Sequence, residues 1–370
     1  MPKQVELKNK EPLVHMVKRD TISIKKAWII RAVALILALI ACAGFIIIIT
    51  NLNPLEVYGG IVNGAVGNKR RMWVTIREIT VLLCIAIGLA PAFKMKFWNI
   101  GAEGQILMGG VAAAALMIYG GDNIPNSILL ICIFICSAIA GMLWGIVPAV
   151  FKAYFNTNET LFTLMLNYVA IQIVNFCIVF WENPSGSNTV GIINSATKAG
   201  WFPDVFGMTY GLNIILAGIL TIGMFIFMKS SKMGYEISVV GESADTARYA
   251  GINVKKVIMK TMALSGAICG FAGSLIVSGA SHTISTSTSG GFGFTAIIVA
   301  WMAKFNSFAM ILVSGILIFM DEGAIQIATE YGLNENASDI ITGIILFFLI
   351  GCEFFIKYRL KFRNSKEVQG

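Results

Sequence analysis

Charge is scarce in this chain of 370 residues: Asp, Glu, Lys and Arg together account for 13% of the residues, whereas 56% are hydrophobic. A mean hydropathy of +0.77 places the chain among polytopic membrane proteins rather than soluble globular ones. The formal net charge is +8, but no basic patch is interleaved with aromatic residues, as nucleic-acid binding would require. The composition therefore predicts a bilayer environment and no nucleic-acid partner.

Residues that bind metals or nucleotides are also few. The two histidines, His15 and His282, belong to no spaced ligand set, and there is no GxxxxGK[ST] loop to hold nucleotide phosphates. The seven cysteines lie within or at the ends of apolar runs and form no CxxC pair, so we interpret them as small packing residues. The sequence therefore predicts no metal site, no cofactor and no enzymatic activity, and any ATP hydrolysis must come from another chain.

Long apolar runs are the main feature that is present, because a helix of about 20 apolar residues spans the ~30 Å hydrocarbon layer. Nine runs qualify: 27–50, 74–93, 98–120, 126–149, 161–181, 209–228, 257–279, 308–328 and 338–357. A tenth, 292–303, is short and begins GGFGF, which is typical of a half-helix or of a tilted or re-entrant segment. We predict an all-α polytopic membrane protein with about ten transmembrane helices.

The basic residues predict the topology, because lysine and arginine favour the cytoplasmic side of short loops. The N-terminal tail is basic, so we place it inside, and ten crossings then put the basic C-terminal tail inside as well. Lys69, Arg70 and Arg71 disagree, since they fall outside, whereas acidic residues such as Asp122, Asp321 and Glu322 fall outside as expected. Three parts follow: a cytoplasmic tail 1–26, a single transmembrane domain 27–357 and a cytoplasmic tail 358–370.

Ionisable residues inside the predicted spans are rare and would mark ion paths or proton relays. Four of them lie near helix ends, where they can snorkel towards water: Arg31, Arg77, Glu78 and Glu353. Glu103 is left as the main interior charge. We therefore expect a neutral polar cargo and an energy source outside this chain.

The longest cytoplasmic loop, 229–256, contains the segment GESADTARYAGINV. Helix-forming residues from Ser243 to Tyr249, followed by Gly251 as a stop, predict a short helix. It would present Glu242, Asp245, Arg248 and Tyr249 between two spanning helices, where a soluble partner could dock; a solvated linker is the alternative when the loop is considered alone.

Four motifs occur in one order: FWNIGAEGQ from Phe97, NETLFTLMLNYVA from Asn158, GESADTARYAGINV from Gly241 and GGFGFTAIIVA from Gly290. Together they resemble the simple-sugar and nucleoside permeases of bacterial ABC importers, in the wider group that includes ribose and branched-chain amino-acid permeases. The resemblance covers roughly residues 75–350. Trp98 stands where the family usually has Phe.

This resemblance implies a multi-pass permease subunit of the bacterial cytoplasmic membrane that carries a nucleoside or simple sugar. Its implied partners are a second related permease, a cytoplasmic ABC ATPase and an extracytoplasmic binding lipoprotein or protein. The loop then resembles a coupling helix that docks on the ATPase through Gly241, Glu242, Asp245, Arg248, Tyr249, Gly251 and Asn253. An ion-coupled secondary transporter of a small polar solute remains the alternative, although it gives this loop no role.

Four polar residues in the predicted spans are candidates for the translocation path: Asn99, Glu103, Gln105 and Asn167. Asn99 and Glu103 are four residues apart, so we expect them to share a helix face, with Gln105 pointing elsewhere. Two interpretations stay open for FWNIGAEGQ, a helix start with Asn99 as its cap and a polar lining of the path. For Asn167 they are an interhelical hydrogen bond and a contact to the solute.

Overall fold

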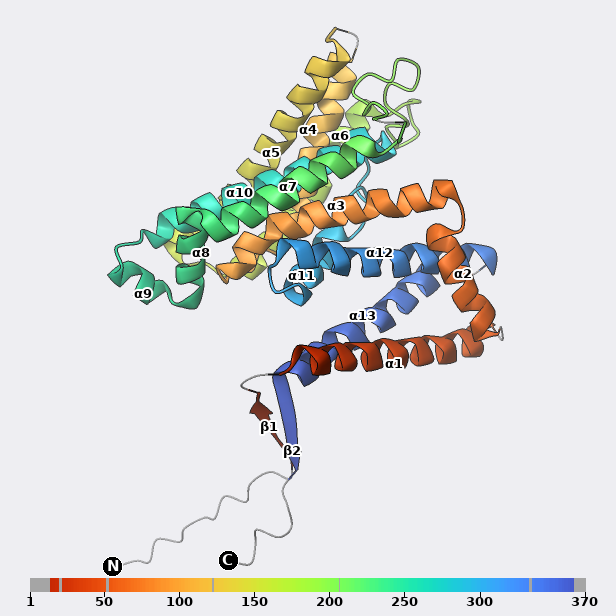
Figure 1. The fold of residues 1–370 in the computed structure, drawn as a ribbon. Coiled ribbons are helices and arrows are strands. Elements are labelled where there is room, and N and C mark those ends of the chain that lie inside the picture. The colour runs from red at the N-terminus through yellow and green to blue at the C-terminus, as the bar shows by residue number, and fades with distance from the viewer. Residues whose placement is uncertain are drawn as a thin grey trace, which may run out of the picture. The chain divides into compact units, whose positions relative to one another are not determined.

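A computed structural model of the chain describes residues 14–19, 22–50, 53–121, 123–205, 207–332 and 335–362. The outer parts of both predicted tails, 1–13 and 363–370, lie outside these residues, as does Asp122. The described residues are mostly helical (Figure 1).

Nine helices of the described residues are long and apolar enough to cross a membrane, which confirms the nine predicted runs. Their bounds are α1 Ile24–Thr50, α3 Lys69–Lys94, α4 Ala102–Gly120, α5 Asn126–Phe155, α6 Glu159–Trp181, α7 Gly211–Ser230, α10 Val254–Ile276, α12 Ser307–Glu330 and α13 Glu335–Lys357. The predicted short segment forms α11, Phe292–Met302, which has 11 residues and cannot span the hydrocarbon layer as a helix.

Several elements were not predicted. A short helix α2, Pro54–Val66, precedes α3, and α8, Lys232–Glu242, precedes the predicted loop helix, which is α9, Ala244–Tyr249. A π-helical turn η1, Val277–Ser281, extends α10. Strands β1, Val14–Lys18, and β2, Tyr358–Phe362, form an antiparallel pair.

The chain divides into two compact units, residues 1–61 with 323–370 (unit 1) and residues 62–322 (unit 2). In unit 1, α1 packs against α13, and Arg31 forms an ion pair with Glu353 at 2.6 Å. These two charges therefore neutralise each other across the helix pair rather than reaching water separately. Since β1 pairs with β2, both ends of the described chain lie at the same end of unit 1, as an even number of crossings requires.

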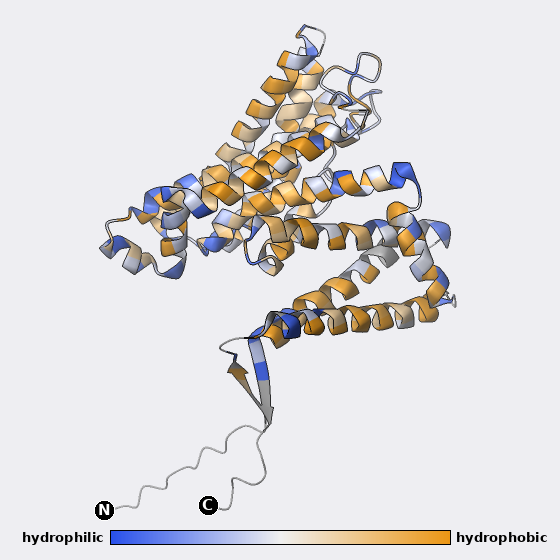
Figure 2. Ribbon diagram, viewed as in Figure 1, coloured by the Kyte–Doolittle hydropathy of each residue, from blue (hydrophilic) through white to orange (hydrophobic). Residues whose placement is uncertain are grey.

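In unit 2, α10 is the central helix and packs against α3, α4 and α5. Glycines permit these close crossings: a Cβ at Gly270 would lie 2.3 Å from the carbonyl oxygen of Ser137 on α5, and one at Gly109 on α4 would lie 2.0 Å from the carbonyl oxygen of Gly270. The glycines of α10 therefore allow close helix packing. Exposed apolar side chains lie on α5, α6 and α7. Hydrophilic residues gather over α8 and α9 (Figure 2).

Candidate functional site

The helix bundle of unit 2 has two ends, and the residues at these ends differ in chemistry. At one end, a pocket of about 290 Å³ is lined by residues that include Met95, Lys152, Glu159, Gly241 and Val254. These residues come from the α3–α4 connection, α5, α6, α8 and the start of α10. We call this the α9 end, because α8 and α9 lie there, and it carries the basic residues that predict a cytoplasmic location.

The opposite end of unit 2 is held by the loop that connects α6 to α7. Asn194 in this loop donates a hydrogen bond to the carbonyl of Met117, near the end of α4, at 2.7 Å. The N–H of Ile193 donates to the carbonyl of His282 at 2.8 Å, and the His282 ring stacks on Trp201 with a centroid separation of 3.7 Å. Burial lowers the pKa of His282, and the positive charge of Arg77 acts in the same direction.

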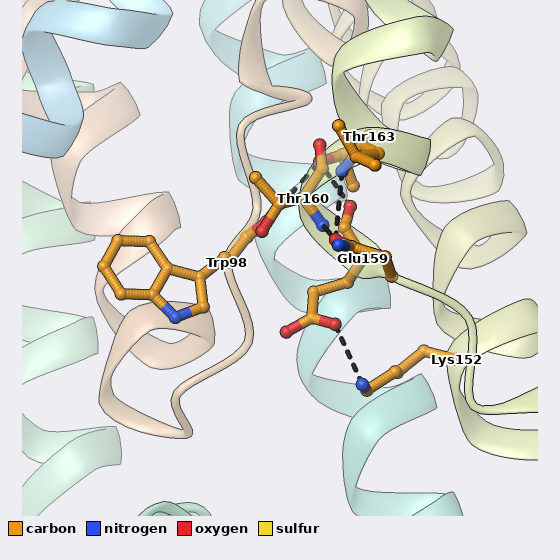
Figure 3. Close-up of polar contacts among 7 residues, drawn as sticks. Trp98, Lys152, Glu159, Thr160 and Thr163 are labelled. Atoms are coloured by element: carbon orange, nitrogen blue, oxygen red, sulfur yellow. Dashed lines mark hydrogen bonds and ion pairs between the residues drawn. The ribbon is translucent and has the colours of Figure 1, made fainter.

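Between α3 and α4, the start of the FWNIGAEGQ motif forms a bend rather than a helix. The N–H of Ile100 donates to the Thr163 hydroxyl oxygen at 3.2 Å, and that hydroxyl donates to the carbonyl of Glu159 at 2.8 Å. Figure 3 shows Thr163 above Glu159, whose carboxylate forms an ion pair with Lys152 at 2.9 Å. The beginning of α6 therefore fixes the bend.

Asn99 lies within this bend and is fully buried. Its amide nitrogen is 3.3 Å from both the Gln105 side-chain oxygen and the Ser265 hydroxyl of α10, and the Gln105 amide donates back to Asn99 at 3.3 Å. The prediction that Asn99 and Glu103 share a helix face was wrong, because α4 begins only at Ala102. Gln105, which we expected to point elsewhere, is the partner of Asn99.

Asn167 on α6 binds the backbone at the start of α4. Its oxygen accepts the N–H of Gly104 at 2.9 Å, and its nitrogen donates to the carbonyl of Ile100 at 2.9 Å. The first N–H groups of a helix lack partners within the helix, so this amide satisfies one of them. In this conformation Asn167 makes the interhelical bond that was one of its two predicted interpretations.

Glu103 is 6% exposed and reaches α11, far along the chain. Its carboxylate accepts the N–H of Gly293 at 2.8 Å, and the Ser289 hydroxyl and the Phe294 N–H also contact it. A carboxylate at a helix N-terminus is stabilised by the unpaired N–H groups and the helix dipole. Glu103 thus joins the start of α4 to the start of the half-helix.

The residues before α11 were missed in the sequence. Six of the seven residues 283–289, TISTSTS, carry hydroxyl groups, and we call this stretch the hydroxyl segment. Within it the N–H of Ser285 donates to the Thr288 hydroxyl at 2.8 Å. The density of hydroxyl residues next to GGFGF is the feature of the sequence that could have identified this segment.

The predicted coupling residues divide into two groups. Asp245, Arg248 and Tyr249 are exposed on α9, where Arg248 and Asp245 form an ion pair at 2.8 Å and Tyr249 is 94% exposed. Glu242 and Gly251 are also exposed, and Asn253 caps α10 by accepting the N–H of Lys256.

Gly241 is instead buried. A Cβ at this position would lie 2.1 Å from the carbonyl oxygen of Lys94 at the end of α3. The end of α8 therefore packs directly against the start of the α3–α4 bend. Among the described residues, no group of three or more His, Cys, Asp or Glu residues is placed to hold a metal ion.

Residues 73–350 match the family described as branched-chain amino acid transport system / permease component. The chain belongs to this permease family. It is 30% identical over 320 residues to the guanosine ABC transporter permease protein NupP of Bacillus subtilis, covering 86% of this chain and 91% of NupP.

Two further relatives are more distant. The chain is 24% identical to the glucose ABC transporter permease protein TsgB13 of Haloferax volcanii, covering 88% of each protein, and 26% identical to the nucleoside ABC transporter permease protein NupB of Lactococcus lactis, covering 83% of this chain and 86% of NupB. No significant match to a solved structure was found. The resemblance to sugar and nucleoside permeases is confirmed, and this permease is a multi-pass membrane protein.

Proposed function

We propose that this permease is the membrane subunit of a bacterial ABC importer and that a separate ATPase docks on α9. The observation that carries the proposal is the geometry of α9, which exposes Asp245, Arg248 and Tyr249 while the adjoining α8 packs through Gly241 against the α3–α4 bend. A force applied to α9 would therefore reach the bend through a tight backbone contact.

The proposed cargo is a nucleoside or a simple sugar. The names of NupP, NupB and TsgB13 support this class, as does the scarcity of buried charge in the spans, which favours a neutral solute. A second related permease and an extracytoplasmic binding protein complete the proposed importer in the cytoplasmic membrane.

We assign Asn99, Glu103, Gln105 and Asn167 a gating role rather than direct contact with the cargo. All four are buried and hydrogen-bonded to other groups of this chain. They join the starts of α4 and α11 at the α9 end, where a change of partners would move both helices.

Reconstitution tests the function directly. The permease is placed in vesicles with its partner permease, the ATPase and the binding protein, and uptake of a labelled nucleoside and a labelled simple sugar is measured with and without ATP. We expect ATP-dependent uptake of one of the two. Uptake that persists without the ATPase and follows a proton or sodium gradient would instead establish the secondary transporter.

The role of α9 predicts the effect of reversing one charge. Arg248→Glu should leave the complex assembled but lower coupled uptake by about tenfold or more, because loss of a complementary charged contact costs about 2 kcal/mol or more. The matched control is Lys232→Glu on α8. The Lys232 side chain is 90% exposed, and its ammonium nitrogen lies 3.9 Å from the Glu236 carboxylate, so the pair is a long one. Normal coupled uptake by Arg248→Glu at normal abundance would exclude a docking role for Arg248.

A further inference from the structure

The chain between η1 and α11 crosses much of unit 2 without forming a helix. It starts at His282, which is hydrogen-bonded to the same α6–α7 loop that binds the carbonyl of Met117, so these two residues lie at a similar depth. It ends at Gly293, whose N–H binds the Glu103 carboxylate. Met117 and Glu103 are fourteen residues apart on α4, or about 21 Å along a helix. The connecting chain covers this depth in eleven residues, which could extend to about 38 Å.

Buried anchors confirm this path. Ile284 packs near Gly110, about midway along α4: a Cβ on Gly110 would lie 3.6 Å from the end of the Ile284 side chain. Ser289 is buried against Glu103. The hydroxyl segment therefore runs at membrane depth along α4, from the opposite end towards the α9 end.

The other side of the segment is open in this chain. Ser287, Gly290 and Gly291 are exposed, and the Ser287 hydroxyl lies 3.0 Å from that of Ser285. Gly290 and Gly291 have φ values of +56° and +74°, which end the segment in left-handed turns before α11.

Such a surface cannot face lipid. Non-helical backbone and exposed hydroxyl groups have no hydrogen-bond partners in hydrocarbon, so at membrane depth they are tolerated only inside protein or along a water-filled cavity. In a carrier of polar solutes, discontinuous helices at this depth are where solute sites form.

We propose that the hydroxyl segment lines a water-filled solute path and hydrogen-bonds the hydroxyl groups of a neutral polyhydroxylated solute, such as the sugar ring of a nucleoside or a simple sugar. Serine and threonine hydroxyls both donate and accept, which matches the hydroxyls of a sugar without requiring charge. This assignment rests on the proposed transport function for its cargo, but not for its contact with water.

The contact with water is tested by thiol reactivity in the assembled complex after the native cysteines are replaced. Ser287→Cys is compared with Phe176→Cys on α6, which is also exposed but on an apolar helix face. The charged reagent MTSET reacts with thiolates, and an apolar environment raises a thiol pKa, so Ser287→Cys should react about tenfold faster or more. Equal, slow reaction of both variants would overturn the water-filled path.

The contact with solute is tested by uptake. Ser287→Ala should raise the apparent KM for the transported solute about threefold to tenfold, the effect of one lost hydrogen bond. The control Ser185→Ala, in the loop between α6 and α7, should not change the KM. In a separate measurement, the transported solute should slow the reaction of MTSET with Ser287→Cys.

An unchanged KM in Ser287→Ala, with no protection of Ser287→Cys by solute, would overturn the solute contact even if the thiol reacts. If the importer carries a solute without hydroxyl groups, the solute contact is also wrong. The thiol test needs no solute, so failure of the proposed function remains distinguishable from failure of the water-filled path.

Discussion

Glu103 shows how one residue can link distant parts of the permease. It lies in the first turn of α4, and its carboxylate accepts backbone and hydroxyl hydrogen bonds from the start of α11. These hydrogen bonds hold the two helix starts together, and an ionised carboxylate accepts stronger hydrogen bonds than a neutral group does. Any motion that separates α11 from α4 must break these bonds.

The charge and the volume of Glu103 can be tested separately. Glu103→Gln keeps the volume and one acceptor, so the complex should assemble, but transport should fall because the charged cap is lost. Glu103→Ala should impair both assembly and transport, because the Gly293 N–H loses its partner at a cost of about 1–3 kcal/mol. Complex yield and uptake are measured for each variant, with Glu236→Gln on α8 as the control.

A different result would assign Glu103 another role. If Glu103→Gln transports like the parent protein and Glu103→Ala only reduces the amount of folded complex, the residue is structural and takes no part in gating.

At the scale of an element, the main feature of α10 is that the backbones of neighbouring helices approach it closely. Its glycines bring the backbones of α4 and α5 within van der Waals contact, and no side chain fits between them. Close packing of this kind is rigid, so α10 with α4 and α5 should behave as one body during transport.

Two glycine substitutions test this packing. Gly270→Ala should destabilise the protein by about 1–3 kcal/mol, because its Cβ would overlap the backbone of α5. Gly218→Ala on α7 has nothing within 4 Å of the new Cβ and should be neutral or slightly stabilising. Thermal unfolding midpoints in one detergent decide between these expectations, and equal midpoints for the two variants would contradict the close crossing of α10 and α5.

At the scale of the whole molecule, the ten-crossing topology requires that α11 and the hydroxyl segment together make one crossing. The two ends of unit 2 support this, because α10 ends at the opposite end and Trp301 at the end of α11 stacks on Trp98 at the α9 end. The centroids of these rings are 5.6 Å apart. Among the described residues, nine long helices and one broken crossing then give an even number.

Labelling from each side of the membrane tests this topology. In a background without native cysteines, Thr246→Cys on α9 should react with an impermeant maleimide only from the cytoplasm, and Ser185→Cys only from outside. Both positions are exposed. The neighbouring Ser243 is left unchanged because its hydroxyl caps α9. Reaction of both from the same side would show that the topology is wrong.

The sequence by itself determined the positions of the long helices, because the thickness of the hydrocarbon layer sets the length of each apolar run. It also determined α9, since a serine cap and a glycine stop act within a few residues of the helix. The family followed from four motifs. The strands β1 and β2 could not be predicted, because each is five residues long and its partner is at the other end of the chain.

Only the tertiary structure decided which groups the polar motif residues contact. Asn167, Ser265 and Gly293 bond to the region from Asn99 to Gly104 from 63, 166 and 190 residues away in the chain. Local spacing predicted a continuous helix face there, whereas a bend formed because these distant partners satisfy its backbone and amide groups. Hydrogen bonds between residues so far apart depend on how the helices pack, and helix packing is not encoded in the spacing of a nine-residue motif.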